Sequence, residues 1–296
     1  MQRTIESFLD FLVAERGFSL NTIAAYRNDL SQFATFVAEQ AATKNLEPEW
    51  AAVDRGLILS YILAIKEKSY ASATVARKVA AIKTFSDFLV NKRILKRNPT
   101  ADISGPKMVK SLPKTISIAE IEELLKQPIL TLEGQRDRAM LELLYATGMR
   151  VGELVSLNVD DVNLKDGFVR CLGKKGKKRS IPIQRKAISA LSDYLEEARP
   201  DLLGEHKEDA LFLNRRGQRL TRQGFWFNLK NYAQKAGIEA EITPNILRHT
   251  VATHLLHSGK KNLKELQQLL GHANISTTQV YSHVTSDYAH PSGLRP

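Results

Sequence analysis

Apolar residues recur at every third or fourth position through most of the first hundred residues, which is the period of amphipathic helices. The pattern predicts a helix that ends near Gly17, a second after Ser19 or Asn21, a third over residues 54–68 and a fourth that begins at Ser72 or Thr74. On the fourth segment, apolar positions such as Phe85 and Leu89 would face a common core. We therefore expect residues 1–98 to form a small all-helical domain.

Prolines interrupt the helical pattern after the fourth segment. Pro99, Pro106 and Pro113 all fall within a short stretch that also carries several lysines. Proline cannot continue a helix, and it favours an extended conformation in the residue before it. The sequence therefore predicts a basic interdomain linker over residues 99–115.

The period of the pattern changes in the remainder of the chain. Ser117 and Glu120 match a capping box at the start of a helix, and a strongly apolar helical segment ends at Gly148. Apolar and polar residues then alternate with period two in three segments, around 162–164, 168–172 and 179–183. Helical periods return after Lys186 and continue to the end.

Two turn signals separate the three alternating segments. Asp166-Gly167 is a hairpin signal, and residues 173–178 form a turn rich in glycine and lysine. Pro182 restricts the third segment to a sheet edge, because proline has no backbone N–H to donate to a neighbouring strand. The predicted fold is mainly α with a small antiparallel sheet (α+β), in which the sheet belongs to a mixed domain over residues 116–296.

The charge balance indicates a polyanionic partner. The chain carries 43 Lys and Arg residues against 32 Asp and Glu, a net charge of +11, while its 43% apolar content is ordinary for a globular protein. An excess of this size favours nucleic acid as a partner, although an ordinary basic surface is an open alternative on charge alone.

The cysteine count and the distribution of apolar residues indicate the cellular compartment. Cys171 is the only cysteine, so an intramolecular disulfide and a thiolate metal site are both excluded. Glu6 and Asp10 interrupt the first apolar residues, which leaves no signal-peptide core, and no apolar run approaches the roughly 18 residues of a membrane helix. We expect a soluble, cytoplasmic protein with no membrane partner.

Several polar residues fall at positions suited to binding an anion. Arg150 follows the break at Gly148 and begins a helical pattern, where backbone N–H groups and the helix dipole favour negative charge. Glu153 lies three residues on and can accept a hydrogen bond that orients the Arg150 side chain. Taken alone, this pair is typical of an exposed ion pair on a helix surface.

The last sixty residues carry a second group of polar side chains. Pro244 matches the first position of a helix, which places Asn245 and Arg248 one turn apart on the same face. Gly271 matches a helix C-cap, and Tyr281 falls on a short helical segment after it. A tyrosine in such a place is usually a packing residue.

Three histidines in this region could suggest a metal site. His249, His254 and His257 lack the spacing of a His-x-x-x-His zinc motif, and no acidic residue lies among them. We therefore predict no metal ion and no cofactor. His249 is expected to brace the site or the helix, and the other two to be surface or core residues.

Three longer strings connect these observations to a family. ATGMRVGELVSL at 146–157, LRHTVATHLL at 247–256 and LLGHANISTTQVYSHV at 269–284 resemble the active-site motifs of tyrosine recombinases. Nearly the whole chain resembles the Xer-type members of that family. The resemblance implies an N-terminal core-binding domain, a C-terminal catalytic domain with a tail that docks on a partner protomer, and the catalytic residues Arg150, Lys174, Arg248, His272 and the nucleophile Tyr281.

Two further positions bear on the chemistry. In this family the lysine after the first glycine of the hairpin turn acts as general acid, and Lys174 takes that place, with Lys175 or Lys177 as alternatives in register. Asn245 stands three residues before Arg248, where the family usually has histidine. An asparagine amide can hold a phosphate oxygen but cannot take up a proton, so we expect weakened rather than abolished activity.

The resemblance also implies a reaction and its partners. The protein is expected to be a site-specific recombinase that cleaves and rejoins DNA through a 3′-phosphotyrosyl intermediate, in the resolution of chromosome or plasmid dimers. Its expected partner is double-stranded DNA with a specific recombination site, on which a homo- or hetero-tetramer assembles. Phosphate contacts are expected from seven basic residues: Arg77, Lys78, Lys83, Lys107, Lys110, Lys175 and Lys177.

Four alternatives are open at this point. An integrase of a mobile element shares every motif, although many integrases carry an additional N-terminal domain. A type IB topoisomerase shares the chemistry but typically lacks this domain arrangement. Asn245 permits a catalytically weakened DNA-binding paralogue, which the other catalytic residues argue against. A helix-turn-helix regulator fits the internal hairpin poorly.

Overall fold

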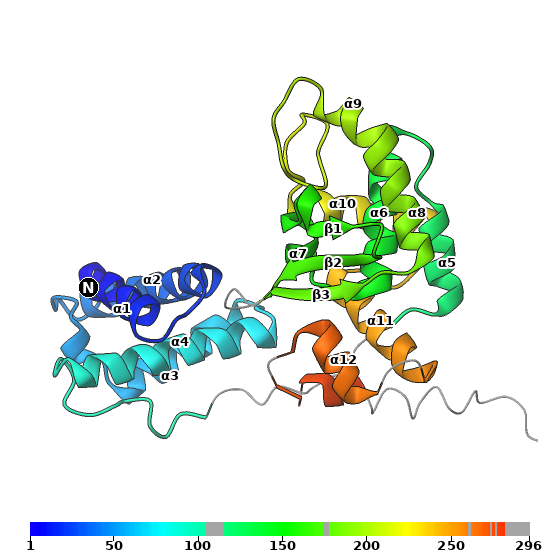
Figure 1. Ribbon diagram of the computed structural model, residues 1–296. Coiled ribbons are helices and arrows are strands. Elements are labelled where there is room, and N and C mark those ends of the chain that lie inside the picture. The colour runs from blue at the N-terminus through cyan, green and yellow to red at the C-terminus, as the bar shows by residue number, and fades with distance from the viewer. Residues whose placement is uncertain (105–114, 174–177, 260–261, 273, 276, 282–296) are drawn as a thin grey trace, which may run out of the picture. The chain divides into compact units, whose positions relative to one another are not determined.

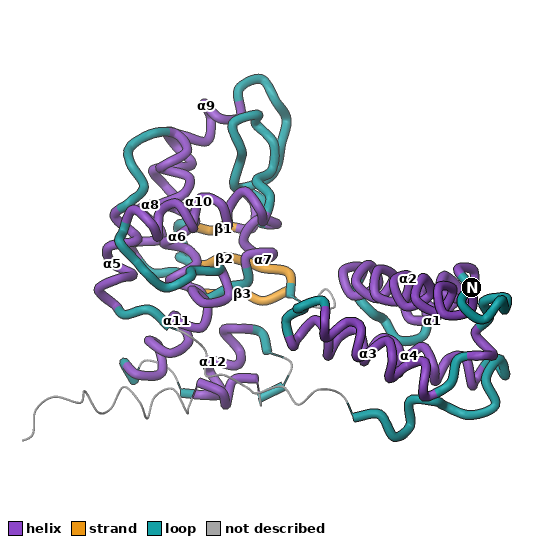
Figure 2. The backbone as a smooth tube through the Cα atoms, turned by 180° about the vertical axis from the view of Figure 1, so that it is seen from behind, coloured by secondary structure: helices purple, strands orange, loops and turns teal. Residues whose placement is uncertain are grey.

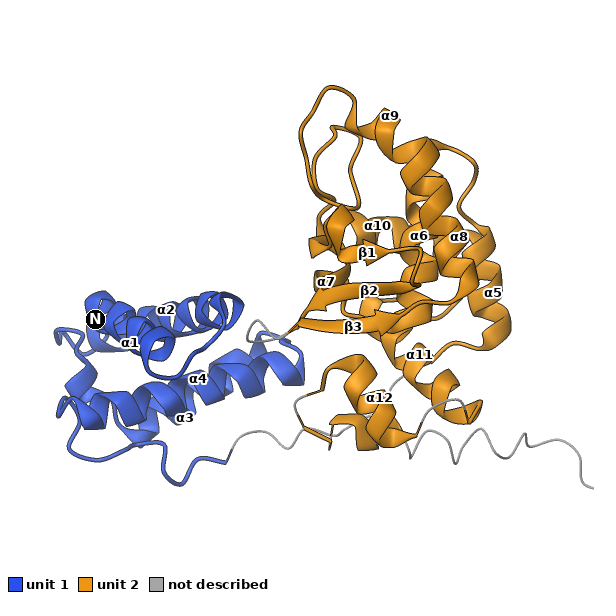
Figure 3. Ribbon diagram, in the orientation of Figure 1, with its two compact units in different colours: residues 1–110 blue, residues 111–296 orange. Residues whose placement is uncertain are grey.

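The computed structural model describes residues 1–104, 115–173, 178–259, 262–272, 274–275 and 277–281. It divides the chain into two compact units, residues 1–110 and 111–296 (Figure 3). The predicted fold class is confirmed, because helices dominate both units and a single three-stranded antiparallel sheet lies in the described part of the second (Figure 1). Among the described residues, no helix has the length and apolar character needed to cross a bilayer.

The first unit is helical, as the period of three to four residues predicts. Its helices are α1 (Gln2–Ala14), α2 (Leu20–Ala42), the 3-10 turn η1 (Trp50–Ala52), α3 (Arg55–Glu67) and α4 (Ser72–Asn91). Ser19 caps α2 by accepting a hydrogen bond from the Thr22 backbone N–H. Aromatic rings fill the core, where Phe85 contacts both Phe8 and Trp50.

A buried charge network joins α2 to α4 inside this unit. Asp29 is fully buried, and its carboxylate accepts hydrogen bonds from Arg77 and from the ammonium of Lys78, the latter at 3.0 Å. The same ammonium donates to Gln32 Oε1 at 2.7 Å, and only 2% of the Lys78 side chain is exposed. In place of the predicted phosphate contact, Lys78 therefore has an internal role, because burial removes its charge from the surface.

The second unit holds the sheet and the remaining helices. Its elements are α5 (Ile118–Lys126), α6 (Leu132–Thr147), α7 (Val151–Ser156), the 3-10 turn η2 (Val159–Asp161), β1 (Val162–Asn163), β2 (Phe168–Leu172), β3 (Lys178–Pro182), α8 (Arg185–Asp193), the π-helical turn η4 (Tyr194–Ala198), α9 (Arg199–Leu203), α10 (Arg222–Lys235), α11 (Pro244–His257) and α12 (Leu263–Leu270). Residues 277–281 are also helical. The predicted capping box of Ser117 and Glu120 begins α5.

The sheet presents one face to the core. Its order is β1-β2-β3, so β3 with Pro182 is an edge strand as predicted. In the register of β2 and β3, Val169 pairs with Ile181 and Cys171 with Arg179. Because side chains alternate along a strand, Arg179 lies on the same inner face as the buried residues Val169, Cys171 and Ile181. The ribbon view and the tube view from behind both place α11 and α12 beyond the β3 edge (Figure 1 and Figure 2).

We expect the substitution Asp29→Ala to destabilise the first unit by about 3–5 kcal/mol, because it leaves the Lys78 ammonium buried without its counter-charge. Urea denaturation of the wild type and the variant measures this difference. The matched control is Glu6→Gln, which removes an ion pair with Arg27 whose side chains are 48% and 42% exposed, and should cost less than about 1 kcal/mol. Equal losses from the two substitutions would contradict this account.

Candidate active site

Arg248 is one of two deeply buried arginines among the described residues of the second unit. Thr243 caps α11 through the Ile246 N–H, and Pro244 takes the first helical position as predicted. Arg248 lies one turn after Pro244 with only 7% of its surface exposed. Its guanidinium donates to two backbone carbonyls at 2.6 Å each, those of Gly148 and Leu270. Burial, and then the nearby Arg150, lower the pKa of Arg248 to about 10, so it stays charged at neutral pH.

Arg150 lies at the N-cap of α7, and Glu153 orients it. Glu153 Oε2 accepts from the Arg150 backbone N–H at 2.8 Å, and its Oε1 accepts from the guanidinium at 3.2 Å. The predicted interaction between the two side chains is therefore present. A second nitrogen of Arg150 lies 3.5 Å from the Gly271 carbonyl oxygen.

Arg179 is a member of the cluster that the sequence analysis did not single out. Its two terminal nitrogens donate to the two Glu153 oxygens at 2.8 and 2.9 Å, a bidentate pair. Its Nε donates to the Leu269 carbonyl at 3.2 Å. Its position in β3 is the sequence signal that identifies it. Side chains two residues apart on a strand point to the same face, so Arg179 shares the inner face with the apolar Ile181.

The three arginines meet at the C-terminal end of α12. The last carbonyls of a helix have no partner within it, and the helix dipole makes that end negative. Gly271 terminates α12 with a φ of +63°, and a Cβ there would lie 2.8 Å from a nitrogen of Arg179. Glycine is therefore required both for the left-handed conformation and for the close approach of the cation.

The cluster carries more positive than negative charge. Arg150, Arg179 and Arg248 surround one carboxylate, that of Glu153, and the remaining partners described above are neutral carbonyls. Burial raises the pKa of the Glu153 carboxyl, but hydrogen bonds and charge from Arg179 and Arg150 outweigh it, so the net shift is downward. Such an unbalanced cluster is suited to binding an anion, since arginine forks match phosphate or carboxylate oxygens.

His272 follows the α12 C-cap and contacts the arginines. Its Nε2 lies 3.0 Å from a nitrogen of Arg248, and its Nδ1 lies 2.9 Å from the Thr278 hydroxyl. Burial, then Arg248 and Arg150, lower the pKa of His272 to about 4, so the ring is neutral at pH 7. Because Arg248 can only donate, Nε2 must accept and Nδ1 carries the proton.

Tyr281 closes the site from the helical segment 277–281. Only 1% of its surface is exposed, and its hydroxyl lies 2.7 Å from His249 Nδ1. The ring of His272 stacks on that of Tyr281, with centroids 6.4 Å apart. Burial raises the pKa of the Tyr281 phenol, while Arg248 and Arg150 act in the opposite direction.

The other predicted site residues separate into three groups. Asn245 is exposed in the first turn of α11. Arg77 and Lys83 have internal partners, the Asp29 carboxylate and the Ile103 carbonyl. The remaining predicted residues lie outside the described part of the chain: Lys107, Lys110, Lys174, Lys175 and Lys177.

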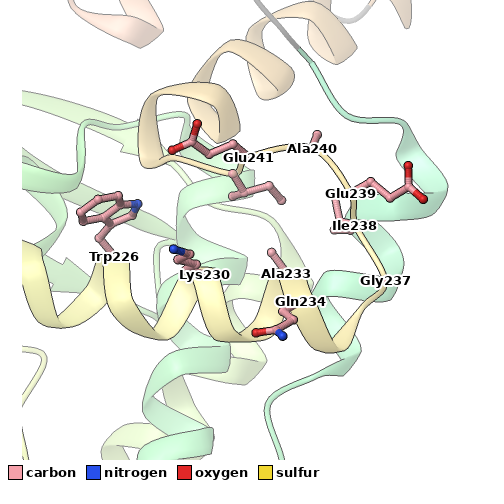
Figure 4. A pocket seen from close by; sticks show the side chains of 10 residues that line it. Trp226, Lys230, Ala233, Gln234, Gly237, Ile238, Glu239, Ala240 and Glu241 are labelled. Atoms are coloured by element: carbon pink, nitrogen blue, oxygen red, sulfur yellow. The ribbon is translucent and has the colours of Figure 1, made fainter. Parts of the chain in front are cut away.

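Among the described residues, metal-ligand side chains do not gather at this site, and one hollow of the second unit lies away from it. In the described ranges, no three His, Cys, Asp or Glu side chains gather as metal ligands would. His254 is held internally, with Nδ1 at 3.3 Å from the Tyr145 hydroxyl and Nε2 at 3.1 Å from the Ile116 carbonyl. A hollow of about 540 Å³ lies between α10 and the loop after it, lined by residues such as Trp226 and Lys230, and contains none of the arginine cluster (Figure 4).

Comparison with known proteins identifies both units. The model of the phage integrase family matches residues 114–287, and that of the phage integrase N-terminal SAM-like domain matches residues 5–93. Tyrosine recombinase XerC of Herpetosiphon aurantiacus is 50% identical to this chain, over 98% of it and 93% of the relative. Tyrosine recombinase XerD of Oceanobacillus iheyensis is 43% identical, over 96% of this chain and 95% of the relative.

Solved structures agree in fold. The crystal structure of XerA recombinase aligns with a TM-score of 0.53 and 28% identity, over 99% of this chain and all of that one. The structure of XerH site-specific recombinase bound to a palindromic difH substrate, a post-cleavage complex, aligns with a TM-score of 0.77 and 22% identity, over 98% of this chain and 83% of that one.

We expect Glu153→Gln to lower the free energy of unfolding by roughly 3 kcal/mol at pH 7, because Arg179 loses a buried counter-charge. The folded-state pKa of Glu153 lies below its unfolded value of about 4.5, so its contribution is complete above that pH and is lost as pH falls through the folded value. Denaturant titrations from pH 7 to pH 3 should show the wild type and the variant converging at the acidic end.

The matched control for this experiment is Glu123→Gln. That carboxylate pairs with Lys126 on the surface of α5, where the two side chains are 48% and 69% exposed. Its loss should change stability by less than about 1 kcal/mol at any pH tested. A constant gap between wild type and Glu153→Gln across the pH range would contradict the charge pairing proposed for the cluster.

Proposed function

The chain belongs to the phage integrase family and is a site-specific tyrosine recombinase of the Xer type, and from this premise we propose that it breaks and rejoins double-stranded DNA through Tyr281. The observation that carries the assignment of the nucleophile is the electrostatic setting of this residue. Its phenol is buried beside an arginine cluster whose charge a single carboxylate does not balance. A phosphodiester supplies the missing negative charge.

In this proposal the cations act on the oxygens of the scissile phosphate. Arg150 and Arg248 hold the two non-bridging oxygens, because planar guanidinium groups bind them in forked geometry and stay charged. His272 contacts the same phosphate through Nε2, the atom that now faces Arg248. The phosphate charge would favour protonation of this ring, which burial and then the surrounding arginines suppress in the free protein.

The reaction then proceeds by transesterification. The Tyr281 oxygen attacks phosphorus, the bond to the 5′ oxygen breaks, and a 3′-phosphotyrosyl link forms. Lys174 is proposed to protonate the departing 5′ oxygen. A 5′ hydroxyl from another strand reverses the step, so the energy of the phosphodiester is kept and no external energy source is needed. Fixed cations supply the electrostatic stabilisation that a metal ion supplies in other phosphoryl-transfer sites.

We further propose the cellular setting that the named relatives suggest. XerC and XerD relatives cover nearly the whole chain, which favours the resolution of chromosome or plasmid dimers in the cytoplasm over the integration of a mobile element. Residues 1–98 and 116–296 would contact the duplex as two domains joined by the basic linker 99–115. Four protomers would assemble on two duplexes, each with its C-terminal tail docked on a neighbour.

A covalent-capture experiment tests this proposal and lets the protein select its own DNA site. A pool of duplexes with a fixed nick and randomised flanks is incubated with the wild type in the absence of divalent metal. Covalent protein–DNA adducts are then isolated under denaturing conditions and amplified over several rounds. We expect adducts with the wild type and none with Tyr281→Phe, because phenylalanine lacks the attacking oxygen.

The matched control is Tyr145→Phe. That tyrosine also bonds a histidine of α11, His254, so its loss removes a similar hydrogen bond at a different place. Adducts should form with this variant as with the wild type. Selective binding of duplexes by the wild type with no adduct would instead indicate the weakened paralogue that Asn245 permits, and an adduct with Tyr281→Phe would overturn the assignment of the nucleophile.

A further inference from the structure

The Tyr281 hydroxyl has a basic partner that its proposed role requires. His249 Nδ1 lies 2.7 Å from the Tyr281 oxygen, which is a short distance for a hydrogen bond between nitrogen and oxygen. The two rings are tilted against each other with centroids 5.5 Å apart. Because Tyr281 is almost fully buried, this contact is not shared with bulk water.

The state of the His249 ring suits it to accept a proton. Burial, and then the adjacent Arg248, lower the pKa of His249 below its usual 6.5, so the ring is neutral at physiological pH. A neutral imidazole has one nitrogen with a free lone pair. With the proton on Nε2, the lone pair of Nδ1 faces the phenol, and Tyr281 donates to it.

The other candidates for this role are occupied or unsuitable. Asn245 is exposed in the first turn of α11, and its amide cannot take up a proton. Both ring nitrogens of His272 have partners, Nε2 with Arg248 and Nδ1 with Thr278. The contact between His249 and Tyr281 is therefore the one in the described site that joins the nucleophile to a base.

We propose that His249 is the catalytic base that removes the Tyr281 proton during DNA cleavage, and that it thereby takes the role that Asn245 cannot perform. This inference rests on the proposed function of Tyr281 as nucleophile. The Tyr281 O–H bond breaks, its proton moves to His249 Nδ1, and its electron pair forms the bond to phosphorus. The 5′ oxygen leaves with the electrons of the broken bond and takes a proton from the general acid of the site.

The charges around His249 are compatible with this transfer. The groups that face it are Arg248 on its own helix and, from the chain after α12, His272 and Tyr281. Arg248 opposes an imidazolium in the free protein. During the attack, negative charge accumulates on the phosphate that the arginines hold, and this charge offsets the new positive charge on the ring. The base is thus effective when DNA is bound.

The test compares the wild type with His249→Asn in single-turnover cleavage of a duplex obtained by the covalent capture described above. Asparagine places an amide oxygen near the position of Nδ1, so it can accept a hydrogen bond from Tyr281 but not a proton. At pH 7 we expect cleavage to slow by about 10²–10⁴-fold, which is the usual contribution of a general base.

The pH profile separates loss of a base from loss of structure. The wild-type rate should be level above pH 7 and fall as pH drops through the His249 pKa, because the protonated ring cannot accept. In His249→Asn the phenol must ionise by itself, so the rate should rise by roughly tenfold per pH unit and approach the wild-type rate at alkaline pH. A deficit of equal size at every pH would overturn the proposal.

A substrate with sulfur in place of the leaving 5′ oxygen provides a second test, which distinguishes a general base from a general acid. Sulfur leaves without protonation, so this substrate rescues the loss of a general acid but not that of a base. We expect His249→Asn to stay slow on it, and full rescue would mean that His249 acts on the leaving group instead. If His249→Asn unfolds at a lower temperature than the wild type, His249→Gln is measured in the same way.

A control variant, and the outcome for the wild type, distinguish failure of the Tyr281 proposal from failure of the His249 proposal. His254→Asn removes a structural histidine of the same helix, and any rate deficit it causes should be independent of pH. A wild type that forms no adduct overturns the proposed function and this inference with it. A wild-type adduct combined with a pH-independent deficit in His249→Asn overturns the inference alone.

Discussion

The active centre depends on one interaction, the docking of guanidinium groups on the C-terminal end of α12. A helix leaves its last carbonyls without internal partners, and its dipole makes that end negative. The carbonyls of the last two helical residues and of the C-cap receive Arg179, Arg248 and Arg150, which come from β3, α11 and the start of α7. Because carbonyls orient these cations without cancelling their charge, the cluster stays attractive to a phosphate.

This arrangement prepares the site before DNA arrives. Arg248 is bound at 2.6 Å to the carbonyl at each of two helix ends, Gly148 of α6 and Leu270 of α12. Gly148 has a φ of +59°, and a Cβ there would lie 2.9 Å from the Leu270 side chain. The absence of a side chain at Gly148 therefore lets the ends of α6 and α12 approach each other beside Arg248. A cation fixed by the fold needs little reorganisation when charge develops on the phosphate, which is the condition for strong electrostatic catalysis.

Local sequence patterns determine where helices begin and end, but they carry no information on partners from distant elements. The capping box of Ser117 and Glu120, the first helical position of Pro244 and the C-cap at Gly271 are confirmed, because a helix end is decided by a few neighbouring residues. Lys78 is expected above to contact phosphate, although it lies three residues after Val75 and therefore on the buried side of α4. Its partner Asp29, on another helix, could not be predicted from the local pattern.

The sequence alone decided the family, the fold class and the residue types of the active centre, because long motifs and periodic burial are properties of the chain itself. The tertiary structure decided which of those residues meet. Arg179 reaches Glu153 across 26 positions, His249 reaches Tyr281 across 32, and Arg248 reaches a carbonyl 100 positions away. Periodicity reports that a face is buried but not what packs against it, so the base proposed for Tyr281 became visible only once α11 and the C-terminal segment were placed together.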